Sequence, residues 1–173
     1  MKTAFIVVDY QNDFVSGALG FPGAESLDEP ISRAVAEARE KGWDVIYTLD
    51  THFEDYMNTA EDKKLPIPHC IKGTAGHALF GQVAESRQAG DPVFEKLTFG
   101  SLELAAYLAA KGYGQVILCG LVAHICVLSN AVLAKAALPE ARIAVAADLT
   151  LSPDPADKER ALASLAGVQV DVL

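Results

Sequence analysis

The chain has 173 residues, of which 51% are hydrophobic and 21% are charged. This length suits one domain with a sizeable core, expected to span residues 1–173, and the hydrophobic fraction argues against disorder. The 14 basic and 23 acidic residues give a formal net charge of −9. Such an acidic surface repels phosphate groups. Neither nucleic acid nor a membrane surface is therefore an expected partner.

Three cysteines are too few for a disulfide framework, and an odd number of them cannot all pair. The N-terminal apolar run Ala4–Val8 is shorter than the roughly 7–15 residues of a signal-peptide core. No run approaches the about 20 apolar residues that span a membrane. We therefore expect a cytoplasmic protein whose thiols, Cys70, Cys119 and Cys126, have roles other than pairing.

Short apolar runs alternate with helical stretches along the chain. Thr3–Val8 is apolar and β-branched on both faces and predicts a buried strand. Asp28–Lys41 predicts a helix with Asp28 as its N-cap. Further strands are expected at Asp44–Leu49, Pro92–Glu95, Gln115–Cys119, Arg142–Ala147 and Val168–Val172, and further helices at Ser101–Ala110, His124–Ala137 and Pro155–Leu165.

This alternation predicts a Rossmann-like, three-layer α/β/α fold with a central, mostly parallel six-stranded sheet. Sites in such sheets lie at the carboxyl ends of the strands. Asp9 and Asp50 directly follow the first two strands, and Gly120–Cys126 follows the strand QVILC. The irregular stretch from Asp50 to about Gly76 is also a candidate, because loops of this length in compact domains are usually functional.

Cys126 lies where a strand gives way to a helix. Backbone amides at a helix start carry partial positive charge, which lowers a thiol pKa and can hold an oxyanion. A buried, inert cysteine is the more common alternative for a lone thiol. Cys119 lies within an apolar strand and is expected in the core, whereas Cys70 in the long loop is either reactive or packed.

Two charged residues follow other strands. Asp9 ends a strand that is expected to be buried, where a carboxylate is costly unless it is paired or exposed. A turn-capping role is the alternative for Asp9. Lys96 follows the short strand Pro92–Glu95, and a lysine by itself is usually solvated.

The long loop carries groups that suit a metal. Asp50 and His52 share one side of an extended segment, and Glu61 and His69 follow. Two imidazoles with carboxylates suit Zn²⁺, Fe²⁺ or Mn²⁺, although such residues also populate solvated loops. His77 has no matching partner and is expected at the surface.

Five segments together resemble the isochorismatase-like cysteine hydrolases, and within them the nicotinamidase/pyrazinamidase branch. The resemblance covers almost the whole chain, and each segment falls at an expected strand end or in the long loop. The segments are Val8–Phe14 (VDYQNDF), Leu49–His52 (LDTH), Pro68–Thr74 (PHCIKGT), Glu95–Ser101 (EKLTFGS) and Gly120–Val127 (GLVAHICV).

The resemblance implies a catalytic triad of Asp9, Lys96 and Cys126. Lys96 and the helix start would favour the Cys126 thiolate, and Asp9 would relay a proton between the thiol, the leaving ammonia and the attacking water. A cis peptide bond at Leu121–Val122 is also implied. It would aim the amide of Val122, with that of Cys126, at the oxyanion.

The reaction implied is hydrolysis of nicotinamide to nicotinate and ammonia through a thioester, in the service of NAD salvage. In nicotinamidases a metal orients the substrate ring. Zinc is expected here, with iron or manganese as alternatives. The family pattern also assigns Phe14 and Leu121 to the ring pocket. The residues that match the metal ligands are Asp50, His52, His69 and, as the fourth, Glu61 ahead of Asp62.

Two positions depart from the family pattern. His124 stands where an acidic residue is common, and Pro66 stands where many nicotinamidases carry Trp. A metal-independent cysteine amidase or carbamoyl hydrolase, acting on another small amide, is therefore the alternative enzyme. A binding protein that kept the fold is the non-enzymatic alternative, and a vinyl-ether hydrolase is disfavoured because its chemistry uses no cysteine. The family commonly forms homo-oligomers, so one is expected here.

Overall fold

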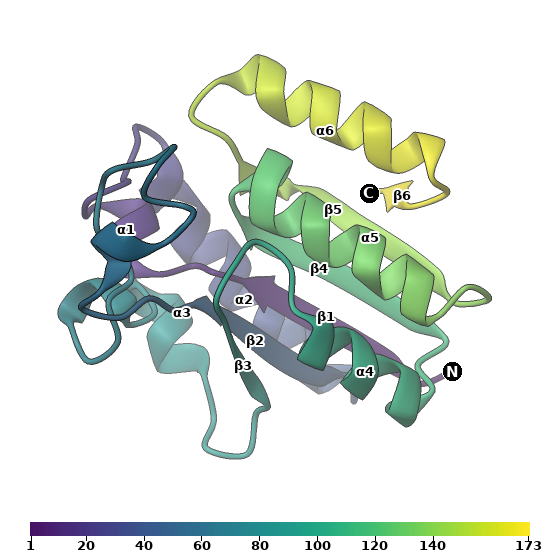
Figure 1. Ribbon diagram of the computed structural model, residues 1–173. Coiled ribbons are helices and arrows are strands. Elements are labelled where there is room, and N and C mark those ends of the chain that lie inside the picture. Colours follow the sequence, from purple (N-terminus) through teal and green to yellow (C-terminus); the bar gives the residue numbers. More distant parts are fainter.

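Six strands form one sheet in the computed structural model, which describes residues 1–173 (Figure 1). The strand order is β3-β2-β1-β4-β5-β6, and every neighbouring pair is parallel. The six-stranded parallel sheet expected from the sequence is thus confirmed. The strands are β1 (Thr3–Val8), β2 (Asp44–Asp50), β3 (Val93–Lys96), β4 (Gln115–Leu121), β5 (Arg142–Leu151) and β6 (Asp171–Val172).

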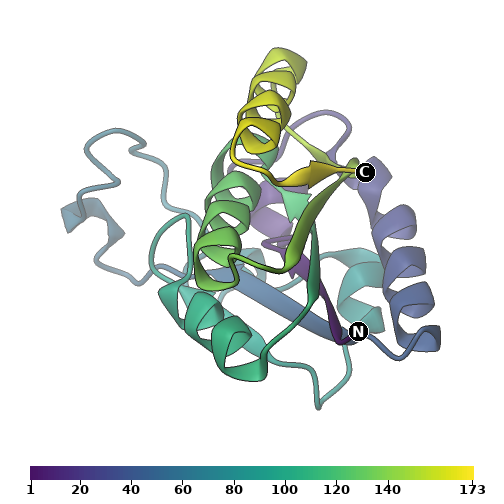
Figure 2. The same cartoon turned by 90° about the vertical axis from the view of Figure 1, so that its right-hand side faces the viewer.

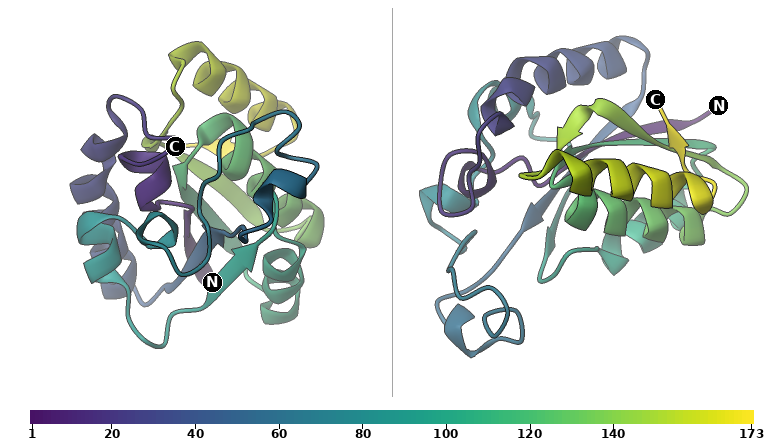
Figure 3. Two further views of the ribbon diagram at one scale, coloured as in Figure 1. Left: turned by 60° about the vertical axis from the view of Figure 1, so that its left-hand side comes forward. Right: turned by 90° about the horizontal axis from the view of Figure 1, so that it is seen from above.

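Helices cover both faces of the sheet (Figures 2 and 3). One face carries α2 (Asp28–Glu40) and α3 (Gly81–Ser86), and the other carries α4 (Leu102–Lys111), α5 (Leu128–Ala137) and α6 (Pro155–Gly167). None of these helices is long and apolar enough to cross a bilayer. The remaining short turns are α1 (Asn12–Val15), η1 (Ala24–Leu27), η2 (Tyr56–Asn58), η3 (Ala75–His77) and the π-helical η4 (Ala123–Val127).

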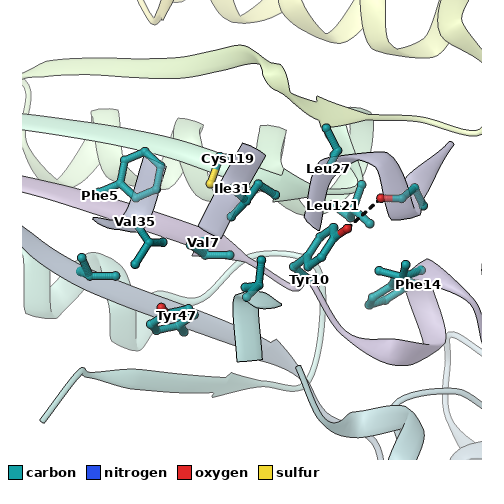
Figure 4. Packing of buried hydrophobic residues seen from close by; sticks show 14 of the residues in the cluster. Phe5, Val7, Tyr10, Phe14, Leu27, Ile31, Val35, Tyr47, Cys119 and Leu121 are labelled. Atoms are coloured by element: carbon teal, nitrogen blue, oxygen red, sulfur yellow. Dashed lines mark hydrogen bonds between the residues drawn. The ribbon is translucent and has the colours of Figure 1, made fainter. Parts of the chain in front are cut away.

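The sheet separates two hydrophobic clusters, because successive side chains of a strand point to opposite faces. Phe5 and Val7 of β1 pack with Val35 of α2 and Cys119 of β4, as Figure 4 shows. The alternate residues of β1, Ala4, Ile6 and Val8, pack on the other face of the sheet against helices α4, α5 and α6. Cys119 is fully buried here, as expected, and burial raises the pKa of its thiol.

Two expectations about the ends of elements were wrong. The last strand is only Asp171–Val172 instead of Val168–Val172. The helix α6 runs to Gly167, and backbone hydrogen bonds of its last turn extend beyond it. The amide of Val168 donates to Leu165, and Gln169 then adopts a positive φ of 64° before the strand begins. By contrast, two strands are longer than predicted. β4 ends at Leu121 instead of Cys119, and β5 ends at Leu151 instead of Ala147.

Asp28 does not cap its own helix. Its carboxylate oxygens accept hydrogen bonds from the backbone amides of Gln82 (3.0 Å) and Val83 (3.1 Å), at the start of α3. The first turn of α2 therefore supplies the cap of a helix more than fifty residues further along the chain. This contact fixes α3 against α2 on one face of the sheet.

An ion pair joins the end of α2 to the segment that leads into β3. Arg39 donates to both carboxylate oxygens of Asp91, at 3.0 and 2.5 Å, and to the carbonyl of Ser86. The Asp91 side chain is 8% exposed and also accepts from the amide of Gln88. Burial acts to raise the pKa of Asp91, but the hydrogen bonds from Arg39 and Gln88 outweigh it and hold the pKa below 3.8.

Replacing this carboxylate is expected to destabilise the fold. Asp91→Asn should lower the free energy of unfolding by about 1–3 kcal/mol at pH 7, measured by urea denaturation. Because the pKa is depressed in the folded state, the stabilisation is full above pH 3.8 and is lost as the pH falls through the folded value. The difference between variant and wild type should therefore shrink in acid.

The matched control is Asp171→Asn, which removes the partner of Arg142 from a pair with both side chains half exposed. Its effect should stay below about 1 kcal/mol. Equal losses for the two variants would show that the burial of Asp91 adds nothing.

Candidate active site

Asp9 lies at the carboxyl end of β1, where the chain turns out of the sheet. The residue has a φ of 45° and is fully buried. Its amide donates to the carbonyl of Thr48 (3.2 Å), and the Thr48 hydroxyl donates to its Oδ1 (2.6 Å). Burial raises the pKa of the Asp9 carboxyl despite the nearby Lys96 ammonium. Asp9 is therefore a buried carboxyl group, fixed by its hydrogen bond from Thr48, and not a solvated turn cap.

Lys96 ends β3 and points into the middle of the site. Its Nζ lies 2.6 Å from Asp9 Oδ2, 3.0 Å from Asp50 Oδ1 and 3.6 Å from Cys126 Sγ, and it also donates to the carbonyl of Thr98. The side chain is 1% exposed, unlike the solvated lysine that is usual at a strand end. Burial acts to lower the pKa of Lys96, but Asp9, Cys126 and Asp50 outweigh it and raise it.

Cys126 is buried in η4, among the charged groups of Asp9, Lys96 and Asp50. Burial raises the pKa of its thiol well above the ordinary value, and the Asp9 carboxylate adds to the rise. The Lys96 charge opposes this but does not outweigh it. Lys96 thus acts in the expected direction, towards the thiolate, while burial and Asp9 act against it.

Asp9 is placed to accept the proton of that thiol. Its Oδ2 forms a 2.6 Å ion pair with Lys96 Nζ, and the same carboxylate is a hydrogen-bond partner of the Cys126 thiol. A carboxylate that bonds to a thiol in this way can accept its proton. The thiol, the carboxylate and the ammonium thus lie together, as the resemblance implied.

The turn that carries Cys126 begins with a close approach of two strands. Gly120 has a φ of 107°, and a Cβ there would lie 2.0 Å from the carbonyl oxygen of Val8. Only glycine lets β4 lie this close to β1 at their carboxyl ends. One residue further along, the peptide bond Leu121–Val122 is cis, as the resemblance implied.

A second cluster lies on the other side of Asp50. Its Oδ2 is 3.0 Å from His52 Nε2 and 3.3 Å from His69 Nε2. Burial acts to raise the pKa of the Asp50 carboxyl, but hydrogen bonds from both imidazoles and the Lys96 charge hold it well below its usual range. Asp50 therefore joins the cluster to the thiol site, with one oxygen facing each.

The donor set of this cluster fits a divalent transition metal. One ligand atom from each of Asp50, His52 and His69 lies within 4.8 Å of the others, and all three residues are buried. His69 Nδ1 lies 2.8 Å from the carbonyl oxygen of Ile67, which directs Nε2 towards the cluster. Such an outer hydrogen bond is typical of histidines that bind metals. Two imidazoles and a carboxylate suit zinc, iron or manganese.

Glu61 is better placed than Asp62 to be a fourth ligand. Its carboxylate oxygens lie 3.6 Å from His69 Nε2 and 3.8 Å from His52 Nε2. The Asp62 side chain contacts neither imidazole, and its Oδ1 is buried without a hydrogen-bond partner. The structure therefore separates two neighbouring residues that the sequence left as first and second choice.

The long loop closes at its base next to the cluster. The amide of His52 donates to the carbonyl of Cys70 (3.0 Å), and the amide of Lys72 donates to the carbonyl of His52 (2.8 Å). The Cys70 amide in turn donates to Asp13 Oδ2 (2.7 Å). Cys70 is fully buried and burial raises the pKa of its thiol, so it is packed and not reactive.

Two contributors to this region were missed or misplaced by the sequence. The ring of Tyr56 packs against His52 and His69, with centroids 4.8 and 5.2 Å away, and its hydroxyl donates to the carbonyl of Leu65. His77 is buried instead of lying at the surface, because its Nε2 is 2.8 Å from the Thr51 hydroxyl. Burial lowers the pKa of His77. Neither contact has a signal in the local sequence.

A cavity of about 230 Å³ opens onto both the thiol and the cluster. Phe14 lines it, as expected, and its ring lies 5.7 Å from that of His69. Leu121 does not line it, because its side chain is fully buried in the core on the α2 face of the sheet. His124 also lines the cavity, with Nδ1 2.8 Å from the Ser152 hydroxyl. The other lining residues are Leu19, Asp50, Glu61, Leu65, His69, Phe99, Val122, Ile125, Cys126 and Pro153.

The fold and the site define a three-layer α/β/α protein with a buried cysteine, lysine and aspartate at the carboxyl ends of its strands. The isochorismatase domain family matches residues 3–173, so the chain belongs to this family.

Individual relatives agree with this family. A Bacillus subtilis protein, the uncharacterized isochorismatase family protein PncA, is 33% identical over 144 residues, which cover 76% of this chain and 78% of the relative. The solved structure of the nicotinamidase/pyrazinamidase PncA from Bacillus subtilis has a TM-score of 0.87 and 28% identity, covering 99% of both chains. N-carbamoylsarcosine amidase from Thermoplasma acidophilum has a TM-score of 0.80 and 28% identity, covering 99% of this chain and 95% of that chain.

Removing the shared ammonium is expected to destabilise the whole site. Lys96→Met leaves the carboxylates of Asp9 and Asp50 without their common cation, and breaking a buried pair in this way costs about 3–5 kcal/mol. Urea denaturation of the variant at pH 7 measures the loss. Lys72→Met, which breaks a half-exposed pair with Glu95, should cost less than about 1 kcal/mol. A Lys96 variant as stable as the Lys72 variant would contradict the ion-pair geometry.

Proposed function

We propose that this chain, a hydrolase of carboxamide C–N bonds, hydrolyses nicotinamide to nicotinate and ammonia. The observation that carries the proposal is that one cavity is lined by the Cys126 thiol and by Asp50 and His69 of the metal-type cluster. A volume of about 230 Å³ suits a substrate with one small ring. The likeness to a nicotinamidase/pyrazinamidase structure supports this substrate class.

In the first step Cys126 acts as the nucleophile. The Asp9 carboxylate, a hydrogen-bond partner of the thiol, takes its proton as Sγ attacks the amide carbon. The Lys96 ammonium, 3.6 Å from Sγ, stabilises the negative charge that develops on sulfur. Burial raises the pKa of the Cys126 thiol, so a base within reach of its proton assists the attack.

In the following steps Asp9 first donates a proton to the leaving amine and then accepts one from water. The proton held by Asp9 passes to the amide nitrogen, the C–N bond breaks, and ammonia leaves a thioester on Cys126. A water molecule, deprotonated by Asp9, then attacks the thioester carbon and releases the carboxylic acid and the thiol. The backbone amides of Val122 and Cys126 are proposed as the donors that hold the oxyanion in both attacks.

The metal ligands in this proposal are Asp50, His52, His69 and Glu61. The ion, zinc in the first instance and iron or manganese as alternatives, would supply a Lewis-acidic position for the pyridine nitrogen of the substrate. Phe14 lines the cavity beside His69 and would cover one side of the ring. Leu121 is excluded from the ring pocket by its burial in the core.

The wider setting is part of the same proposal. Nicotinate is a substrate for NAD salvage, and three unpaired thiols are compatible with the reducing cytoplasm. A homo-oligomer is proposed because large apolar side chains are exposed beside the end of β3, at Leu97, Phe99 and Leu102.

The activity is tested by incubating the metal-supplied protein with nicotinamide and measuring ammonia. Wild type is expected to release ammonia and nicotinate in equal amounts, whereas Cys126→Ala should lose at least about a thousandfold in kcat, since no nucleophile remains. Cys119→Ala is the matched control, because that thiol is buried in the core away from the cavity. Equal rates for wild type and Cys126→Ala would refute the proposal.

The metal requirement separates this function from a metal-independent amidase of the same fold. Elemental analysis should find about one transition-metal ion per chain, and chelation followed by dialysis should abolish nicotinamide hydrolysis. Glu61→Gln should weaken zinc binding by about 10- to 100-fold, while Asp62→Asn should leave it unchanged, because only Glu61 approaches both imidazoles. Full activity after chelation would favour the metal-independent alternative.

A further inference from the structure

Gln11 is a fully buried polar residue to which the mechanism above gives no role. Its side-chain amide makes three hydrogen bonds. Oε1 accepts from the backbone amide of Asp50 (2.8 Å), and Nε2 donates to the carbonyl oxygens of Asp50 (2.9 Å) and His77 (2.8 Å). One side chain thus satisfies both backbone polar groups of Asp50.

The need for these bonds follows from the way β1 ends. The parallel pairing of β1 with β2 reaches Val8 and Thr48, and Asp9 makes the last backbone bond, to the Thr48 carbonyl. The chain then leaves the sheet at Asp9, whereas β2 continues for two more residues to Asp50. The carboxamide of Gln11 occupies the place of the missing peptide group, accepting one bond and donating another as a strand would.

Asp50 needs accurate placement because its two oxygens face different partners. Oδ1 lies 3.0 Å from Lys96 Nζ, and Oδ2 lies 3.0 Å from His52 Nε2 and 3.3 Å from His69 Nε2. On its other side, β2 is held by the backbone pairing of Asp50 with Lys96 in β3. Without Gln11, only one edge of β2 would be fixed at this point.

We propose that Gln11 is a positioning residue that sets the Asp50 carboxylate between Lys96 and the two imidazoles. The inference rests on the proposed function where it concerns metal affinity, and on the structure alone where it concerns the contact between Asp50 and Lys96. Asparagine is one methylene shorter and cannot span the same three bonds. Glutamate keeps the acceptor for the Asp50 amide but presents an anion to two carbonyl oxygens.

The test compares Gln11→Met and Gln11→Glu with wild type. Apo-protein is titrated with zinc ions against a chromophoric chelator, and crystal structures of the variants are determined. Gln11→Met should bind zinc about 10- to 100-fold more weakly, as is typical when an outer partner of a ligand is lost. Gln11→Glu should bind zinc no better than Gln11→Met, because its anion faces two carbonyl oxygens. In the crystals, the 3.0 Å contact between Asp50 Oδ1 and Lys96 Nζ should be lost or lengthened.

Two controls separate positioning from general destabilisation. Val45→Ala opens space in the core at the opposite end of β2, and Asn12→Ala removes an exposed hydrogen bond from the same turn as Gln11. Both should keep wild-type zinc affinity, even where Val45→Ala matches Gln11→Met in loss of thermal stability. If Val45→Ala weakens zinc binding as much as Gln11→Met does, the role of Gln11 is merely structural.

The outcomes are distinguishable from failure of the proposed function. Wild type that binds no zinc would overturn the metal part of that function, and the contact between Asp50 and Lys96 in the Gln11 variants would then decide the inference alone. Unchanged zinc affinity together with an unmoved Asp50 in Gln11→Met would overturn the inference. The neutral Gln11→Asn, which keeps a carboxamide but cannot span all three bonds, provides a second variant if Gln11→Met is too unstable to purify.

Discussion

The buried ammonium of Lys96 is shared by two carboxylates and a thiol, and the rest of the site depends on it. Asp9 and Asp50 bring two negative charges into a region withdrawn from water, and Lys96 supplies only one positive charge. The remaining charge falls on the side of Asp50 that faces His52 and His69. Protonated imidazoles or a bound cation can balance it there. The thiol chemistry and the cluster are thus linked by charge as well as by position.

The turn that follows β1 organises this arrangement from one short stretch of sequence. Asp9 faces the thiol, and Gln11 holds the backbone of Asp50. Asp13 accepts the amide of Cys70 and so fixes the segment next to His69, while Phe14 packs against the His69 ring. Different residues of the turn therefore reach different parts of the site, which explains why the short segment Val8–Phe14 carries so much of the family resemblance.

The sequence predicted what depends on local pattern and missed what depends on distant partners. Apolar, β-branched runs located the strands, and the rule about their carboxyl ends pointed to Asp9 and Asp50. Burial of Lys96 and His77 could not be inferred, because the groups that satisfy them come from other strands and loops. The same is true of Asp28, whose pattern is that of a cap but whose partner helix lies far along the chain. The resemblance, and not the spacing, selected Lys96.

The closure of the long loop at its base bears on how such a site can diverge. His52 pairs in parallel with Ile71, so the two ends of the loop are held together beside the cluster whatever lies between them. The entropic penalty for lengthening a closed loop rises only slowly with its length. Insertions and deletions between Asp62 and Pro68, beyond the proposed ligand Glu61, can therefore reshape the cavity wall at Leu65 while Asp50, with the imidazoles at either end of the loop, stays in register. The catalytic and metal-type residues can therefore stay in place while the loop segment around Leu65 changes the substrate range.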